Sequence, residues 1–137
     1  MVEDKLWNGT RIVLAINAAA SAVFMLIFLI LPETLIPLLY GSWNSRCVTT
    51  ERQLGAIFLG VIIIAFISLK KGEWPPIKLF MEFGILVLLF FGALGIEEMA
   101  VDGPSTGSAI TLVIILALAA INIFAYFKEE KLHKSAK

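Results

Sequence analysis

Four polar side chains stand inside otherwise apolar stretches of this sequence, and they are its best candidates for chemistry: Asn17, Ser68, Glu82 and Asn122. At 1.5 Å per helical residue, each would lie within about 9 Å of the charged residue that bounds its stretch. If they faced one interior cavity, they would form a polar pathway in which the Glu82 carboxylate binds a proton or a cation. In the structural alternative, Glu82 reaches water or pairs with Lys78, and the other three join helices by hydrogen bonds.

The other potentially reactive residues are weaker candidates for a catalytic or metal-binding site. Cys47 is the only cysteine, which excludes an intrachain disulfide and a multi-cysteine metal site. His133 stands in a charged tail that we expect to be solvated, without partner ligands for a metal. An enzyme acting on a lipid or a quinone would need Glu97, Glu98 and Asp102 to collect a metal, but such clusters usually solvate a loop. We therefore predict no catalytic residue, no metal and no cofactor.

The stretches around these residues predict helices that cross a membrane. The chain is 59% hydrophobic and 16% charged, against about 45–50% and 25% in soluble domains. A helix needs about 20 residues to cross the hydrocarbon core, and continuously apolar runs do not fit barrel strands. We predict an all-α fold, in which a single domain over 1–137 forms a four-helix transmembrane bundle with helices near 11–31, 53–69, 77–96 and 108–128.

The basic residues predict the orientation of this bundle. The termini and the middle loop, which four crossings place on one side, hold all basic residues except Arg46 and Arg52. Because Lys and Arg in short loops stay inside, we expect both termini to be cytoplasmic, in the plasma membrane. The formal net charge of zero gives no basic face for nucleic acid, so we expect no nucleic-acid partner.

The outer loop 32–52 is the longest connection, and its first part is apolar. We predict a short interfacial segment along the outer membrane surface, kinked or split at Pro37. Residues 102–105 contain Gly103 beside Pro104, which predicts a turn. The charged tail after Phe127 is expected to extend the last helix beyond the membrane.

Small residues predict where the helices approach one another, because helix association in lipid depends on close packing. Pairs four residues apart occur in the first and second predicted helices, and glycines or alanines recur in the others. These residues are Ala15/Ala19, Ala18/Ala22, Ala56/Gly60, Gly84, Gly92, Gly95, Ala117 and Ala120. The larger apolar faces would then meet lipid or another protein.

The segment Glu51-Arg52-Gln53-Leu54-Gly55-Ala56, which follows the proline-containing stretch 32–41, carries a family resemblance. It resembles the small four-helix DoxX-like membrane families, in which an Arg-x-x-Gly-Ala sequence opens the second helix. The resemblance implies a four-helix fold. Many such families lack an assigned activity, so it implies no catalytic residue.

Two functions follow from these features. The first is a non-catalytic accessory or structural subunit of a larger integral membrane complex, which could be a membrane oxidoreductase. Its partners would be the lipid bilayer and other membrane subunits or a second copy of the chain. The alternative is a small self-contained transporter or proton- or cation-conducting protein that uses Glu82 with Asn17 and Asn122.

Overall fold

The computed structural model is all-helical and describes residues 6–40, 48–101, 103 and 105–135. Its elements are α1 (Asn8–Met25), the π-helical turn η1 (Leu26–Ile30), α2 (Pro32–Tyr40), α3 (Val48–Lys71), α4 (Trp74–Val101) and α5 (Thr106–Ser135). Four helices in this part are long and apolar enough to cross a membrane: α1 with η1, α3, α4 and α5. The predicted all-α fold with four such helices is therefore confirmed, while the side of the membrane that the termini occupy stays a prediction.

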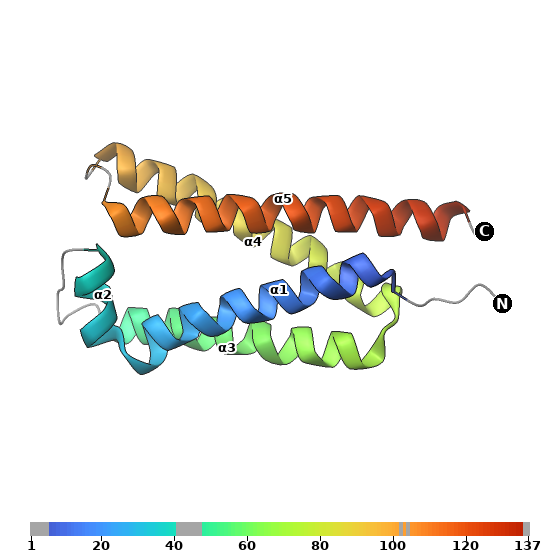
Figure 1. Cartoon of the computed structure of the whole chain (residues 1–137), viewed down its shortest axis with the longest axis horizontal. Coiled ribbons are helices and arrows are strands. Elements are labelled where there is room, and N and C mark those ends of the chain that lie inside the picture. The colour runs from blue at the N-terminus through green and yellow to red at the C-terminus, as the bar shows by residue number, and fades with distance from the viewer. Residues whose placement is uncertain (1–5, 41–47, 102, 104, 136–137) are drawn as a thin grey trace.

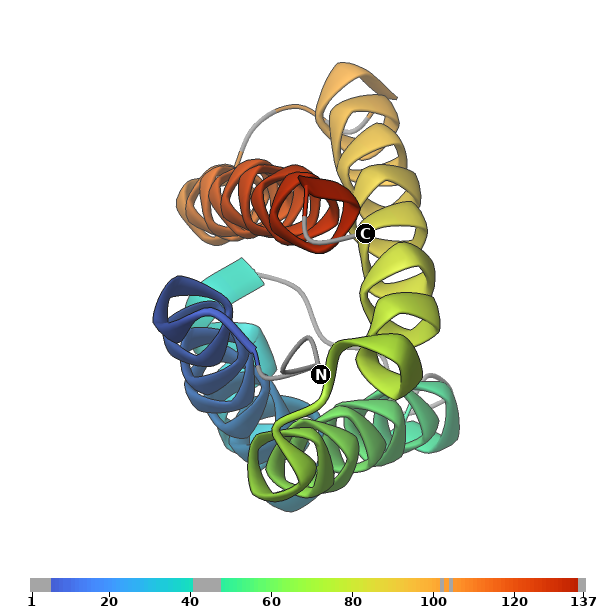
Figure 2. The same cartoon turned by 90° about the vertical axis from the view of Figure 1, so that its right-hand side faces the viewer.

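The long helices form an open arrangement (Figures 1 and 2). α1 packs along α3 and also against α5, and α5 packs along α4, which crosses it obliquely. The start of α1 and the end of α5 lie at the same end of the molecule, together with the α3–α4 connection (Figure 1). We call this the termini end. Its location on the cytoplasmic side stays a prediction from the sequence.

Several helices extend beyond the predicted stretches. α3 begins at Val48 and α4 at Trp74, and α5 continues to Ser135, as expected for a tail that extends the last helix. The first crossing contains an unexpected π-helical turn, in which Leu31 N–H donates to Leu26 C=O at 2.9 Å. Hydropathy marks only the apolar middle of a helix, because backbone hydrogen bonding continues through charged residues.

Local signals explain two helix ends. Gly72 ends α3 with a φ of +68° and donates its N–H to Ser68 C=O at 2.9 Å, as a C-terminal glycine does. Ser105 and Ser108 cap α5 reciprocally, each backbone N–H donating to the other hydroxyl at 3.0 Å. Gly103 has a φ of +84°, the positive value that the predicted turn before α5 requires of it, while Asp102 and Pro104 lie outside the described residues.

The segment predicted to lie on the outer surface forms α2, which turns across the end of the bundle opposite the termini (Figure 1). It is not split at Pro37, which lies inside a continuous helix. Proline removes one backbone hydrogen bond, and packing of α2 on η1, α3 and α5 offsets that loss. Ile36 is buried with Phe24 and Phe28 in a cluster at this end. Cys47 lies outside the described residues.

A close approach between helices involves Gly55, which the small-residue prediction did not name. A Cβ added there would lie 2.6 Å from Leu29 N, in the backbone of η1. Of the predicted pair Ala56/Gly60, Ala56 is exposed, and a Cβ at Gly60 would have no atom within 4 Å. Within the described chain this pair is therefore not packed closely against another helix, although Gly60 is half-buried, because both residues are rotated away from Gly55 around α3.

The remaining small residues divide between packed and outward positions. A Cβ at Gly92 or Gly95 would meet Leu116 or Leu112 of α5 at 3.3 and 3.4 Å, so these glycines contribute to the α4–α5 contact as predicted. Gly84 has no such neighbour within 4 Å. Other small positions predicted to pack are exposed, namely Ala15, Ala19, Ala117 and Ala120, whereas Ala18 and Ala22 are half-buried.

Candidate functional site at the termini end

Two of the four predicted polar residues pair directly with each other. Asn17 of α1 donates from Nδ2 to Asn122 Oδ1 of α5 at 2.8 Å, and Asn122 donates back to Asn17 Oδ1 at 3.0 Å. Asn122 Nδ2 also donates to Leu118 C=O at 2.7 Å. The two amides therefore join α1 to α5, which is the structural role that the alternative interpretation gave them.

Glu82 is held by a neighbouring helix one turn away from this pair. The Tyr126 hydroxyl of α5 donates to Glu82 Oε1 at 2.5 Å. Tyr126 follows Asn122 by four residues, so both project from one side of α5. Ser68 is buried near the end of α3. No hydrogen bond described in the structure joins it to the other three residues.

Lys78, considered as a partner of Glu82, instead bonds to Glu130 of α5. The distance from Lys78 Nζ to Glu130 Oε1 is 2.8 Å. Trp74 Nε1 donates to the same oxygen at 3.3 Å, and Lys134 Nζ lies 3.4 Å from the other oxygen. Trp74, Lys78 and Glu82 recur at four-residue intervals on α4, as Tyr126, Glu130 and Lys134 do on α5. The two helices therefore face each other through a continuous row of polar contacts.

Glu129, like Glu130, is a polar residue of this region that sequence reasoning missed. It is fully buried at 0% exposure, although we expected a solvated tail. Its Oε1 accepts the Trp7 backbone N–H at 2.9 Å and its Oε2 accepts the Thr10 hydroxyl at 2.7 Å. His133 Nε2 lies 3.6 Å from Oε1, and its ring stacks on Trp74 at a centroid distance of 6.2 Å.

The position of Glu129 has a physical reason in the start of α1. Trp7 is the N-cap residue of α1 and its side chain makes no capping hydrogen bond. The free N–H groups there attract a carboxylate, which in a capping box comes from the third helical residue. Here that position is Thr10, and Glu129 supplies the carboxylate from another helix. The sequence contains no clear signal of this contact, because Asn8 is itself a favourable N-cap residue and only the structure shows that Trp7 takes the N-cap position.

The arrangement as a whole is suited to joining helices. Glu82, Glu129 and Glu130 each contact a donor from another helix. In the described part of the chain, no buried side-chain nitrogen or oxygen lacks a partner. Nor do the described residues contain three grouped His, Cys, Asp or Glu side chains that could hold a metal. Asp102 and the side chain of Glu98 lie outside the described part, so the acidic outer group stays a hypothesis.

Comparisons with known proteins give no family for this chain. No family model, curated protein or solved structure matches it. The DoxX-like resemblance therefore stays a prediction, and functional inference depends on the residues themselves.

Proposed function

We propose that this chain is a non-catalytic subunit of a larger integral membrane protein complex. The observation that carries this proposal is the mutual pairing of its intramembrane polar groups. Asn17 bonds to Asn122 and Glu82 bonds to Tyr126, so these groups contribute to joining α1, α4 and α5. A protein whose polar groups serve its own assembly, and whose outer surface is apolar, is suited to filling space between larger subunits.

The outer surface of α4 supports this role. α4 is the least enclosed of the four candidate spans, with 11% of its most apolar window buried. Large side chains recur on one exposed face at three- or four-residue spacing: Leu79, Phe83, Leu86 and Phe90. This face contacts lipid or another subunit when the chain is in a membrane.

The outer face of α3 is the more specific place to test for a partner helix. Ala56 and Gly60 lie four residues apart on it, beside the exposed side chains Ile57, Ile63 and Ile67. Outward-facing small residues leave room for the backbone of a second helix, and such pairs are common in helix–helix contacts within lipid. We therefore expect a subunit contact at this face.

The test is native electrophoresis of the endogenous complex in gentle detergent, with mass spectrometry of the band. We expect a band well above the 15.0 kDa of one chain, containing other subunits. The variant Gly60→Leu should deplete that band, because leucine fills the outward space, yet leave the isolated chain folded. Gly84→Leu is the matched control, since Gly84 also has no neighbour within 4 Å but belongs to α4. A small homogeneous band from the unaltered protein would contradict the proposal.

A transporter is the second candidate, favoured by one observation. The Glu82–Tyr126 bond lies one helical turn along α5 from the Asn17–Asn122 pair. A pathway for protons or cations needs polar groups at such short intervals. Flux measurements on reconstituted Glu82→Gln protein separate this function from the structural one.

A further inference from the structure

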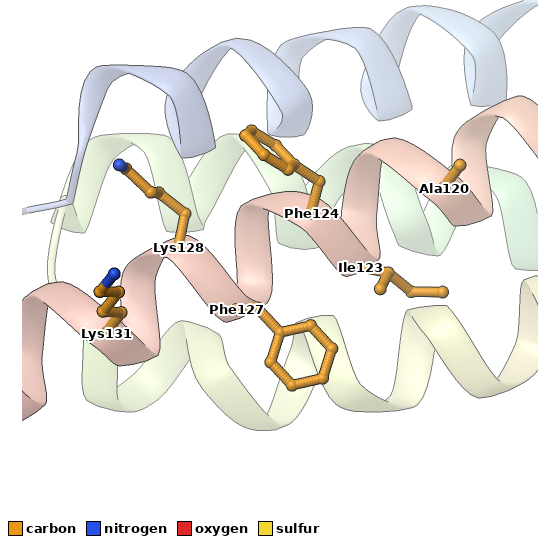
Figure 3. Close-up of a pocket in the computed structure, with 6 residues that line it drawn as sticks. All are labelled: Ala120, Ile123, Phe124, Phe127, Lys128 and Lys131. Carbon is orange, nitrogen blue, oxygen red and sulfur yellow. The ribbon is translucent and has the colours of Figure 1, made fainter.

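A hollow lies along the outer side of α5 towards the termini end (Figure 3). It is open-sided, with a volume of about 680 Å³. Ala120 and Ile123 lie at one end and Lys128 and Lys131 at the other, with two phenylalanines between them (Figure 3). The lining residues are Ala120, Ile123, Phe124, Phe127, Lys128 and Lys131. The hollow thus changes along its length from apolar to cationic.

The two lysines of the hollow differ from neighbouring lysines in their partners. Lys78 and Lys134 are both paired with Glu130. Within the described residues, by contrast, no carboxylate pairs with Lys128 or Lys131. The cationic end of the hollow is therefore left without a counter-charge from the described chain.

Contacts with the start of α1 position one of these lysines. Lys128 Nζ lies 5.9 Å from the centre of the Trp7 ring, in a cation–π arrangement. The Trp7 ring in turn meets Phe124 edge-on, with ring centres 6.4 Å apart. The Trp7 backbone N–H also donates to the buried Glu129. The ring that contacts Lys128 therefore belongs to a residue that the buried polar contacts hold in place.

We propose that this hollow binds an anionic phospholipid. Its phosphate would lie at the ammonium groups of Lys128 and Lys131, and an acyl chain would run over Phe124, Phe127 and Ile123. A soluble phosphate would leave the aromatic surface uncovered, and a neutral lipid would leave both charges unbalanced. The sequence places this end in the cytoplasmic leaflet, where anionic lipids attract basic residues. Each lysine should strengthen binding roughly fivefold, and the two together roughly 30-fold.

The test compares lipid binding by two matched double variants of the full chain. Purified protein in detergent is titrated with phosphatidylglycerol or phosphatidylcholine, and bound lipid is counted by native mass spectrometry. We expect preferential retention of phosphatidylglycerol, weakened roughly 30-fold in Lys128→Gln/Lys131→Gln. Lys70→Gln/Lys71→Gln removes the same charge from the exposed end of α3 and should leave binding unchanged. Circular dichroism verifies that both variants keep their helices.

Three outcomes would overturn the proposal. Equal loss in both double variants would mean that binding follows net charge and not the hollow. If phosphatidylcholine were retained as well as phosphatidylglycerol, the two lysines would not be selecting an anionic lipid. The apolar part is tested by Phe127→Ala, which should weaken binding, against Phe66→Ala on α3, where an equally exposed phenylalanine is removed. If these two phenylalanine variants bound phosphatidylglycerol equally well, the acyl-chain contact would be wrong.

Discussion

Replacing Gly55 with alanine tests the close contact between α3 and η1. In a helix, Gly→Ala by itself stabilises by about 0.5–1 kcal/mol. At Gly55, however, the new Cβ would lie 2.6 Å from Leu29 N and 2.8 Å from Leu29 Cα. Carbon atoms in contact lie about 3.5–4.0 Å apart, so α3 or η1 must shift by about 1 Å. The third obstructing atom is Leu29 Cβ at 2.6 Å, and neither it nor the two backbone atoms can rotate away as the end of a side chain can.

The matched control is Gly60→Ala, in the same helix but with no atom within 4 Å of the added Cβ. Helix propensity contributes equally to both variants, so it cancels in their difference. Overpacking of a close contact costs about 1–3 kcal/mol. We therefore expect Gly55→Ala to have a free energy of unfolding about 1–3 kcal/mol lower than that of Gly60→Ala.

The assay is reversible unfolding of the purified protein in mixed micelles with increasing dodecyl sulfate, followed by circular dichroism. Gly60→Ala should match or slightly exceed the unaltered protein, and Gly55→Ala should unfold at a lower dodecyl sulfate fraction. If Gly55→Ala were as stable as Gly60→Ala, the proposed approach of α3 to η1 would be refuted. Destabilisation by Gly60→Ala would show instead that the outer face of α3 is packed within one chain.

Three further predictions concern the polar contacts. Glu129→Leu should lower the free energy of unfolding by about 1–3 kcal/mol, because the two groups that donate to its carboxylate would lose their partner. Lys134→Gln, which removes the exposed lysine of an ion pair, should change it by less than about 1 kcal/mol. The same dodecyl sulfate titration measures both variants, and equal effects would contradict the buried role of Glu129. A double-mutant cycle of Asn17→Leu and Asn122→Leu should give a coupling energy of about 0.6 kcal/mol, up to about 1.7, and strictly additive effects would argue against the paired amides. Proton or cation flux into vesicles should be the same for Glu82→Gln and the unaltered protein, and carboxylate-dependent flux would favour the transporter.

The sequence by itself determined the helices of this protein. Three stretches without charge, and one whose only charged residues are Lys78 and Glu82, predicted four apolar helices near the length that crosses a membrane, because composition and length are local properties. Local signals were also informative: Gly103 has the positive φ that its predicted turn requires, and the tail after Phe127 continues α5 as expected. The π-helical turn and the unbroken course through Pro37 were not predictable in this way, because packing between segments stabilises them.

Only the tertiary structure decided which residues meet. Hydropathy could place Asn17 and Asn122 at similar depths, but their pairing depends on how α1 and α5 rotate about their axes. Spacing could not show that Gly55 packs closely against η1 while Gly60 has no close neighbour, because small residues occur at several positions around α3. Glu129 makes the same point most clearly: a charged residue in a polar tail is buried where it accepts hydrogen bonds from the start of α1, more than a hundred residues earlier, whose N-cap side chain makes no capping bond.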